Sequence, residues 1–85
     1  MANKTYFWEG PFRFFFYSSD CSEPIHTHVE NGDGEIKVWL STLEVRHKKG
    51  NMRETDINKV VSIIERRYHE MVSIWEAQCS GEGGM

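Results

Sequence analysis

The sequence predicts an α+β domain, with a three- to four-stranded antiparallel sheet covered on one face by one long C-terminal helix. In the first half of the chain, short segments alternate apolar with polar residues, which is the period of a strand with one buried face. In the second half, apolar residues recur every three or four positions, which is the spacing of an amphipathic helix. Because the chain has only 85 residues, we expect a single domain.

The clearest local pattern is a β-hairpin. Residues 25–30 and 35–40 each alternate between apolar and polar side chains, and residues 31–34 read Asn-Gly-Asp-Gly, a strong turn signal. Symmetric closure of this turn predicts the pairs Glu30–Glu35, His28–Lys37 and His26–Trp39 on one face, and Val29–Ile36, Thr27–Val38 and Ile25–Leu40 on the other. A slip of one residue would mix the two faces, so burial of the apolar face enforces this register.

Other strand signals lie on both sides of the hairpin. Residues 6–8 precede a turn, and residues 12–17 form a strand with aromatic side chains on both faces. Residues 18–24 are rich in turn formers and should be a loop. A weaker strand signal covers residues 43–47.

The predicted helix begins with Thr55 as its N-cap and ends near Gln78 or Cys79. Its apolar stripe comprises Ile57, Val60, Val61, Ile64, Tyr68, Met71 and Trp75. A helix of roughly 35 Å is long enough to cross the sheet and cover the apolar face of the hairpin. The glycine-rich residues 80–85 are expected to form a disordered tail, so the predicted domain spans residues 1–79.

Charge and hydropathy exclude some classes of function. A net charge of -3 argues against a protein whose main task is binding nucleic-acid phosphates, although the basic residues 46–49 allow local contact with nucleic acid. The chain has no apolar run near the roughly 20 residues that span a bilayer, and its first residues lack the pattern of a signal peptide. We therefore expect a cytoplasmic protein without membrane contact. Cys21 and Cys79 are compatible with one disulfide, but a reducing cytosol favours two free thiols.

The two histidines belong to a longer pattern. Residues 23–29 read Glu-Pro-Ile-His-Thr-His-Val, and residues 34–40 read Gly-Glu-Ile-Lys-Val-Trp-Leu. Together they resemble domain-of-unknown-function family 4160, a group of small prokaryotic proteins with a Pro-x-His-x-His-Val-like motif. In the family a second proline precedes the first histidine, where this chain has Ile25. The resemblance covers roughly residues 6–79. It implies a compact sheet-plus-helix domain without an assigned activity, and neighbouring helix-turn-helix genes that suggest a toxin–antitoxin pair.

His26 and His28 form a candidate metal site. Alternation places both imidazoles on one strand face, about 6.5–7 Å apart, and neutral histidine is a common ligand of zinc and other divalent transition metals. A third ligand is needed. The residues that could supply it are Asp20, Cys21 and Glu23 in the preceding loop and His47 on another strand. Without a metal, both imidazoles are exposed sheet residues beside Lys37 and Trp39.

We expect an interaction module rather than an enzyme, with no cofactor. The predicted surface consists of His26, His28, Lys37 and Trp39 on the face away from the helix, and Trp is a typical interface anchor. The partner would be a protein or a second copy of the chain, as in a toxin–antitoxin pair, and stacking of unpaired bases is a secondary prediction. The alternative is a small metal-dependent or acid/base nuclease, in which His26 and His28 transfer protons and Lys37 stabilises an anion.

Overall fold

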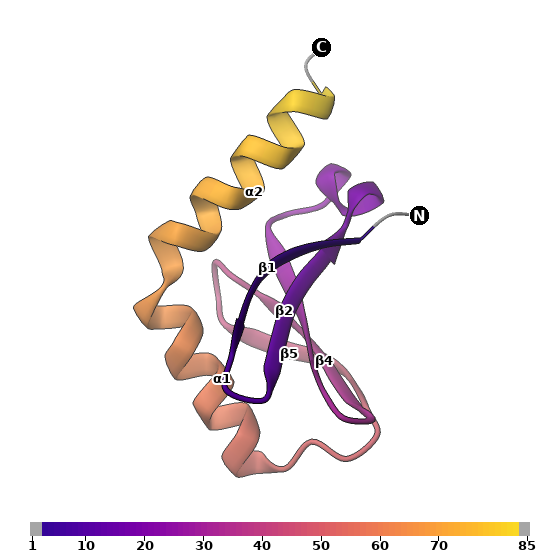
Figure 1. The fold of residues 1–85 in the computed structure, drawn as a ribbon, viewed down its shortest axis with the longest axis vertical. Helices are drawn as coiled ribbons and strands as arrows, with labels where there is room; N and C mark the ends of the chain where they lie inside the picture. Colours follow the sequence, from indigo (N-terminus) through magenta and orange to yellow (C-terminus); the bar gives the residue numbers. More distant parts are fainter. Residues whose placement is uncertain (1–2, 84–85) are drawn as a thin grey trace.

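The sheet has five strands, one more than the largest number predicted. The computed structural model describes residues 3–83. The strands are β1 (Asn3–Glu9), β2 (Phe12–Tyr17), β3 (His26–Asn31), β4 (Gly34–Trp39) and β5 (Glu44–Lys49). They form an antiparallel meander in the order β1-β2-β3-β4-β5 (Figure 1). The segment between β2 and β3 is not an open loop, because it contains the short 3-10 helix η1 (Ser18–Ser22).

The hairpin register predicted from alternation is confirmed. The pairs in β3 and β4 are His26–Trp39, Thr27–Val38, His28–Lys37, Val29–Ile36 and Glu30–Glu35. Just beyond the strands, the backbone N–H of Leu40 donates a hydrogen bond to the carbonyl of Ile25 (3.1 Å). Val29, Ile36 and Val38 are fully buried, as a register enforced by burial requires.

The predicted single helix is two helices, α1 (Glu54–Arg66) and α2 (Tyr68–Gly83). The break falls at Arg67, whose backbone leaves the helical region at φ -109° and ψ 25°. At this point the Arg67 guanidinium lies over the Phe7 ring (3.5 Å) and pairs with Glu9 (2.9 Å) and Glu70 (2.8 Å). The two helices therefore cover one face of the sheet at different angles, and α2 continues to η1 (Figure 1).

Both predicted helix ends are wrong. Helix α1 begins at Glu54 after Arg53, two residues before the expected position, and the Asp56 carboxylate accepts a hydrogen bond from the Arg53 N–H (3.4 Å). Helix α2 extends past Cys79 to Gly83. Residues 80–83 of the predicted disordered tail thus continue the helix, and residues 84–85 lie outside the described residues. Neither described helix is long and apolar enough to cross a membrane.

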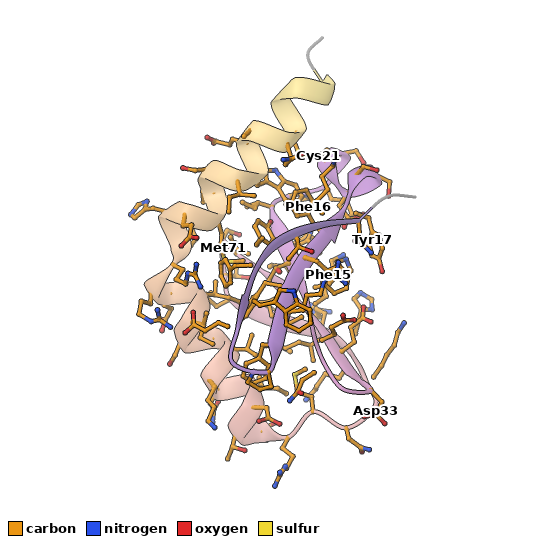
Figure 2. The ribbon with its side chains drawn as sticks, viewed as in Figure 1. Phe15, Phe16, Tyr17, Cys21, Asp33 and Met71 are labelled. Atoms are coloured by element: carbon orange, nitrogen blue, oxygen red, sulfur yellow. A yellow bond between two sulfur atoms is a disulfide. The ribbon has the colours of Figure 1, made fainter. Side chains whose placement is uncertain are left out.

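The core lies between the helices and the sheet, as the apolar stripe predicts. In Figure 2, Phe16 and Met71 point into this layer, whereas Phe15 and Tyr17 lie on the other side of the sheet. From the helices, the predicted core residues that are buried are Ile57, Val60, Ile64, Met71 and Trp75. Their partners on the sheet are Phe12, Phe14, Phe16, Val29, Ile36, Val38 and Leu40. Val61 and Tyr68 are only half-buried and pack at its margin.

A disulfide joins Cys21 of η1 to Cys79 of α2, with 5.4 Å between the two Cα atoms. The expectation of two free thiols is therefore wrong. The two cysteines are far apart in sequence, and they meet because the second half of α2 packs against η1 (Figure 2). The disulfide thus fixes η1, the element that precedes the histidine strand, to the C-terminal helix.

Candidate metal centre

On the sheet face opposite the core, the aromatic side chains bury one another. Phe15 points away from the helices, yet it is only 2% exposed. Its ring contacts the Arg13 guanidinium (4.4 Å), His28 (5.4 Å) and Tyr17 (5.6 Å). The aromatic residues on this face are therefore largely occupied with one another.

The four predicted surface residues are neighbours, as alternation requires. The ring of His26 lies 5.2 Å from both Trp39 and His28, and the Lys37 ammonium sits 4.2 Å above the Trp39 ring. The expectation of an open surface is wrong for His26, which is 0% exposed. The ring of His26 is enclosed by Trp39 and His28 and by Trp75 of α2, whose ring lies 5.4 Å from it.

Asp20 of η1 is the third member of the cluster. Its Oδ2 atom accepts a hydrogen bond from the backbone N–H of Tyr17 (2.9 Å), an interaction that caps the first turn of η1. The same oxygen lies 3.0 Å from Nε2 of His26 and 3.3 Å from Nε2 of His28. One ligand atom from each of these residues lies within 4.8 Å of the other two. We call Asp20, His26 and His28 the Asp–His cluster.

The structure separates the four candidates for a third ligand. Asp20 joins the histidines, whereas Cys21 is held in the disulfide. The Glu23 carboxylate pairs with Lys37 (3.1 Å). His47 lines the cavity next to the cluster without being a member of it. Sequence spacing left these four residues equivalent, because their positions depend on the fold of η1 and on the pairing of β5.

The hydrogen bonds of His26 fix its tautomer. Its Nδ1 atom lies 2.9 Å from the carbonyl oxygen of Pro24, which can only accept a hydrogen bond, so Nδ1 carries the proton. In a neutral ring, Nε2 then carries a lone pair. This atom is fully buried and has no hydrogen-bond partner, although Asp20 Oδ2 is only 3.0 Å away, because the angle does not suit a hydrogen bond. In this neutral form two lone pairs face each other, and a cation between them would remove the repulsion.

His28 can also present a lone pair to the cluster. Its Nε2 atom contacts Asp20, and its Nδ1 atom lies 3.6 Å from Oε2 of Glu35. With the ring proton on Nδ1, Glu35 would be the outer partner and Nε2 would be free to bind a metal. Burial lowers the pKa of His28, although the charges of Asp20 and Glu35 act in the opposite direction. The ring is therefore neutral near pH 7, as a metal ligand must be.

The Asp20 side chain is ionised. Burial by itself would raise the pKa of this carboxyl group, but the hydrogen bond from the Tyr17 N–H and the positive charge that His26 and His28 carry when protonated outweigh burial. The net effect is a pKa below the usual value for aspartate. When both imidazoles are neutral, the cluster offers one anionic oxygen and two nitrogen lone pairs, a donor set that divalent transition metals bind.

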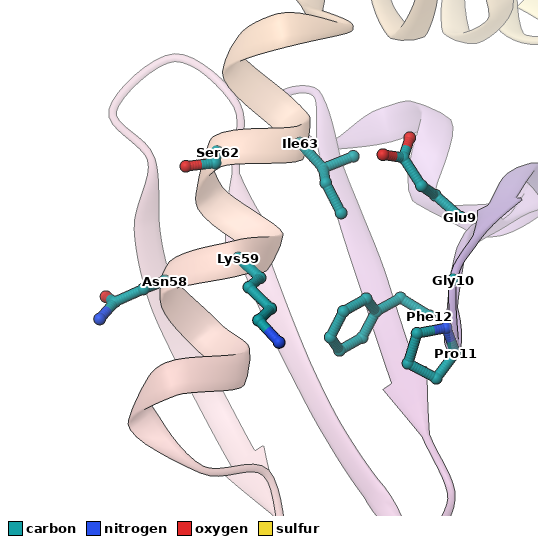
Figure 3. A pocket seen from close by; sticks show the side chains of 8 residues that line it. All are labelled: Glu9, Gly10, Pro11, Phe12, Asn58, Lys59, Ser62 and Ile63. Atoms are coloured by element: carbon teal, nitrogen blue, oxygen red, sulfur yellow. The ribbon is translucent and has the colours of Figure 1, made fainter.

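A polar cavity of about 320 Å³ opens beside the cluster. Its lining residues are Tyr17, Asp20, Glu23, His28, Glu35, Ile36, Lys37, His47 and Lys49. A larger, open cavity of about 490 Å³ lies between the β1–β2 turn and α1, where Phe12, Lys59 and Ile63 contribute to its walls (Figure 3). That second cavity contains no member of the Asp–His cluster. Of these two cavities, only the smaller one is lined by members of the Asp–His cluster.

The fold and the cluster define a small α+β domain with two histidines and one aspartate at one end of an antiparallel sheet. The model of the family described as domain of unknown function (DUF4160) matches residues 12–76. The chain therefore belongs to this family, and the resemblance seen in the sequence is confirmed. All three residues of the cluster lie within the matched segment. No curated protein and no solved structure matches the chain.

Proposed function

We propose that this protein binds one divalent transition-metal ion through Asp20, His26 and His28. The observation that carries the proposal is the buried Nε2 atom of His26, which has no hydrogen-bond partner and lies 3.0 Å from an ionised carboxylate. A buried polar atom without a partner is costly, and the cost disappears if the atom binds an ion. The hydrogen bond from Nδ1 of His26 to the Pro24 carbonyl is of the kind that orients metal-bound imidazoles in other proteins, and Glu35 lies 3.6 Å from Nδ1 of His28, beyond hydrogen-bond distance.

Two of the three ligand separations are close to those of a tetrahedral Zn²⁺ site, and the third, between the two imidazoles, lies within 4.8 Å. Metal–ligand bonds of about 2.0–2.1 Å in a tetrahedral site place neighbouring ligand atoms about 3.4 Å apart. In the cluster, Asp20 Oδ2 lies 3.0 Å from His26 Nε2 and 3.3 Å from His28 Nε2. Three protein ligands leave a fourth position for water or another ligand, which is the pattern of reactive rather than purely structural zinc sites.

The competing explanation is a proton on His26 Nε2, which would make an imidazolium–aspartate ion pair. Such a pair would also relieve the lone-pair repulsion, but its proton would point away from the ideal direction, since the contact does not meet the angle of a hydrogen bond. A metal ion tolerates this arrangement because it occupies the space between all three ligand atoms. The two explanations differ in one measurable property, the affinity for a metal.

The interaction module predicted from the sequence stays a prediction. Its surface is smaller than expected, because His26 is covered by Trp75 and Lys37 is engaged with Glu23 and Trp39. Pairing with a toxin or antitoxin and contact with nucleic acid are likewise predictions without a supporting observation. The metal-dependent form of the predicted nuclease would use the site proposed here.

The test is metal titration of untagged protein after removal of metal with a chelator. We expect one Zn²⁺ per chain by competition with a chromophoric chelator, and a visible Co²⁺ spectrum of nitrogen and oxygen ligation. Asp20→Asn, His26→Gln and His28→Gln should each weaken binding by at least about 100-fold, because even outer-shell changes cost about 10- to 100-fold. His69→Ala is the matched control, since His69 lies exposed on α2 and is not a member of the Asp–His cluster.

Two results would refute the proposal. One is wild-type protein that binds no stoichiometric Zn²⁺ at micromolar concentration, and the other is a set of cluster variants that bind like His69→Ala. Circular dichroism would show whether each variant is folded. If His26→Gln is unfolded, nitrogen chemical shifts of the wild-type imidazoles provide the same test, because Zn²⁺ must shift Nε2 of both His26 and His28.

A further inference from the structure

We propose that the cavity beside the Asp–His cluster binds a phosphoryl group, which bridges the metal ion and two basic side chains of β5, His47 and Lys49. This inference rests on the proposed metal site and adds the chemical class of its ligand. The supporting observations concern the backbone of β5, the partners of its side chains and the charges that line the cavity.

A β-bulge turns these two side chains toward the cavity. In the pairing of β4 with β5, Lys37 lies opposite Arg46, but Glu35 lies opposite Lys49, which leaves one extra residue in β5. Regular pairing would place Lys48 opposite Glu35 and turn His47 and Lys49 to the covered face. With the bulge, both residues line the cavity instead. Bulges commonly re-aim side chains next to functional sites.

The bulge holds His47 in a conformation that is uncommon for a residue with a side chain. Its φ angle is 54°, in the left-handed region that favours glycine. Backbone conformations of this kind persist where the surrounding structure enforces them, and they cluster at ligand-binding sites. The residue with this uncommon backbone is thus one of those that line the cavity beside the Asp–His cluster.

The side chains of Lys49 and His47 have no hydrogen-bond or ion-pair partner in the part of the chain that the structure describes. The neighbouring basic residues are engaged, Arg46 with Glu44 (2.5 Å) and Lys48 with Glu54 (3.8 Å). Apart from the backbone pairing of β5 with β4, no hydrogen bond or ion pair joins the side chain of Lys49 or His47 to any of residues 3–83. The two donors are therefore available to a ligand in the cavity.

Because acidic residues line the cavity, binding of a phosphoryl group there would depend on the metal ion. Asp20, Glu23 and Glu35 are opposed by only two ammonium groups, those of Lys37 and Lys49, so the empty cavity does not favour an anion. Glu23 is paired with Lys37, and Glu35 approaches His28. A bound divalent ion makes the lining net positive and offers an open coordination position. A tetrahedral oxoanion can place one oxygen on the metal and others on Lys49 and His47.

The test uses inorganic phosphate and protein loaded with Mn²⁺, whose unpaired electrons broaden the phosphorus NMR signal of a nearby phosphate. We expect broadening that saturates with phosphate, and at least tenfold weaker binding in Lys49→Gln and His47→Ala. Lys48→Gln is the matched control, because Lys48 pairs with Glu54 and does not line the cavity. Metal-free protein should bind phosphate at least tenfold more weakly than loaded protein.

The failures of the two proposals are distinguishable. If Mn²⁺ and Zn²⁺ do not bind at all, the metal site itself is wrong and this inference falls with it. If the metal binds but phosphate does not, or if Lys49→Gln binds phosphate like Lys48→Gln, only the phosphoryl site is refuted. Acetate that competes with phosphate at equal concentration would also refute it, since a carboxylate cannot make the same three contacts.

Discussion

Removal of the disulfide should destabilise this protein more than any other single change outside the core. Cys21 and Cys79 are separated by 58 residues, and closing a loop of that length in the unfolded chain accounts for about 4 kcal/mol at 25 °C in the chain-entropy description. A small domain has a total free energy of unfolding of about 5–10 kcal/mol. Cys21→Ser or Cys79→Ser should therefore remove roughly half of the stability.

The loss should reach the Asp–His cluster as well. Cys21 follows Asp20 in η1, and Trp75, one helical turn before Cys79, packs on the His26 ring. Opening the disulfide frees η1 from α2 and loosens both contacts. We expect Zn²⁺ affinity to fall in the reduced protein, in parallel with its stability.

The assay is unfolding in guanidinium chloride, with and without a thiol reductant. Because the two serine substitutions break the same bond, Cys21→Ser, Cys79→Ser and the double variant should lose equal amounts of stability. Reductant should lower the stability of the wild type to that of the variants and leave the variants unchanged. A loss below about 1 kcal/mol, or two titratable thiols in the native protein without reductant, would refute the reasoning.

Three further predictions concern the core, a turn and pH. Trp75→Ala should cost about 3–5 kcal/mol of unfolding free energy, because it removes a large ring that is 8% exposed; a loss below about 1 kcal/mol in denaturant titration would show that the stripe of α2 is not core. Gly50→Ala should lower the melting temperature far more than Gly32→Ala. Both glycines have a positive φ, but only a Cβ at Gly50 would overlap the Asp33 carbonyl. Equal decreases in melting temperature for the two variants would contradict this contact. Hydrogen bonds from Arg67 and Arg66 lower the pKa of Glu9 below its ordinary value of 4.5. The stabilisation that ionised Glu9 gives the folded state is therefore present above pH 4.5 and is lost as the pH falls through the lowered pKa of Glu9. The wild type should melt at a higher temperature than Glu9→Gln at pH 7, and the two melting temperatures should converge in acid.

The predicted metal ligands illustrate how far sequence reasoning extends. Alternation was sufficient to place His26 and His28 on one face beside Trp39, and the register confirms that placement. It could not show that His26 is buried, because one of the rings that enclose it belongs to the distant residue Trp75. Asp20 was one of four candidates, and only the fold of η1 brings its carboxylate to the imidazoles.

The sequence by itself determined the features that depend on local periodicity, namely the hairpin, its register and the apolar stripe of the helices. These features follow from the periods of two residues in strands and 3.6 residues in helices, which can be recognised within each segment without knowledge of the rest of the chain. Only the tertiary structure decided the break at Arg67, the disulfide, the bulge in β5 and the closing of the Asp–His cluster. Each of these depends on contacts between segments far apart in the chain, whose distance no local pattern encodes.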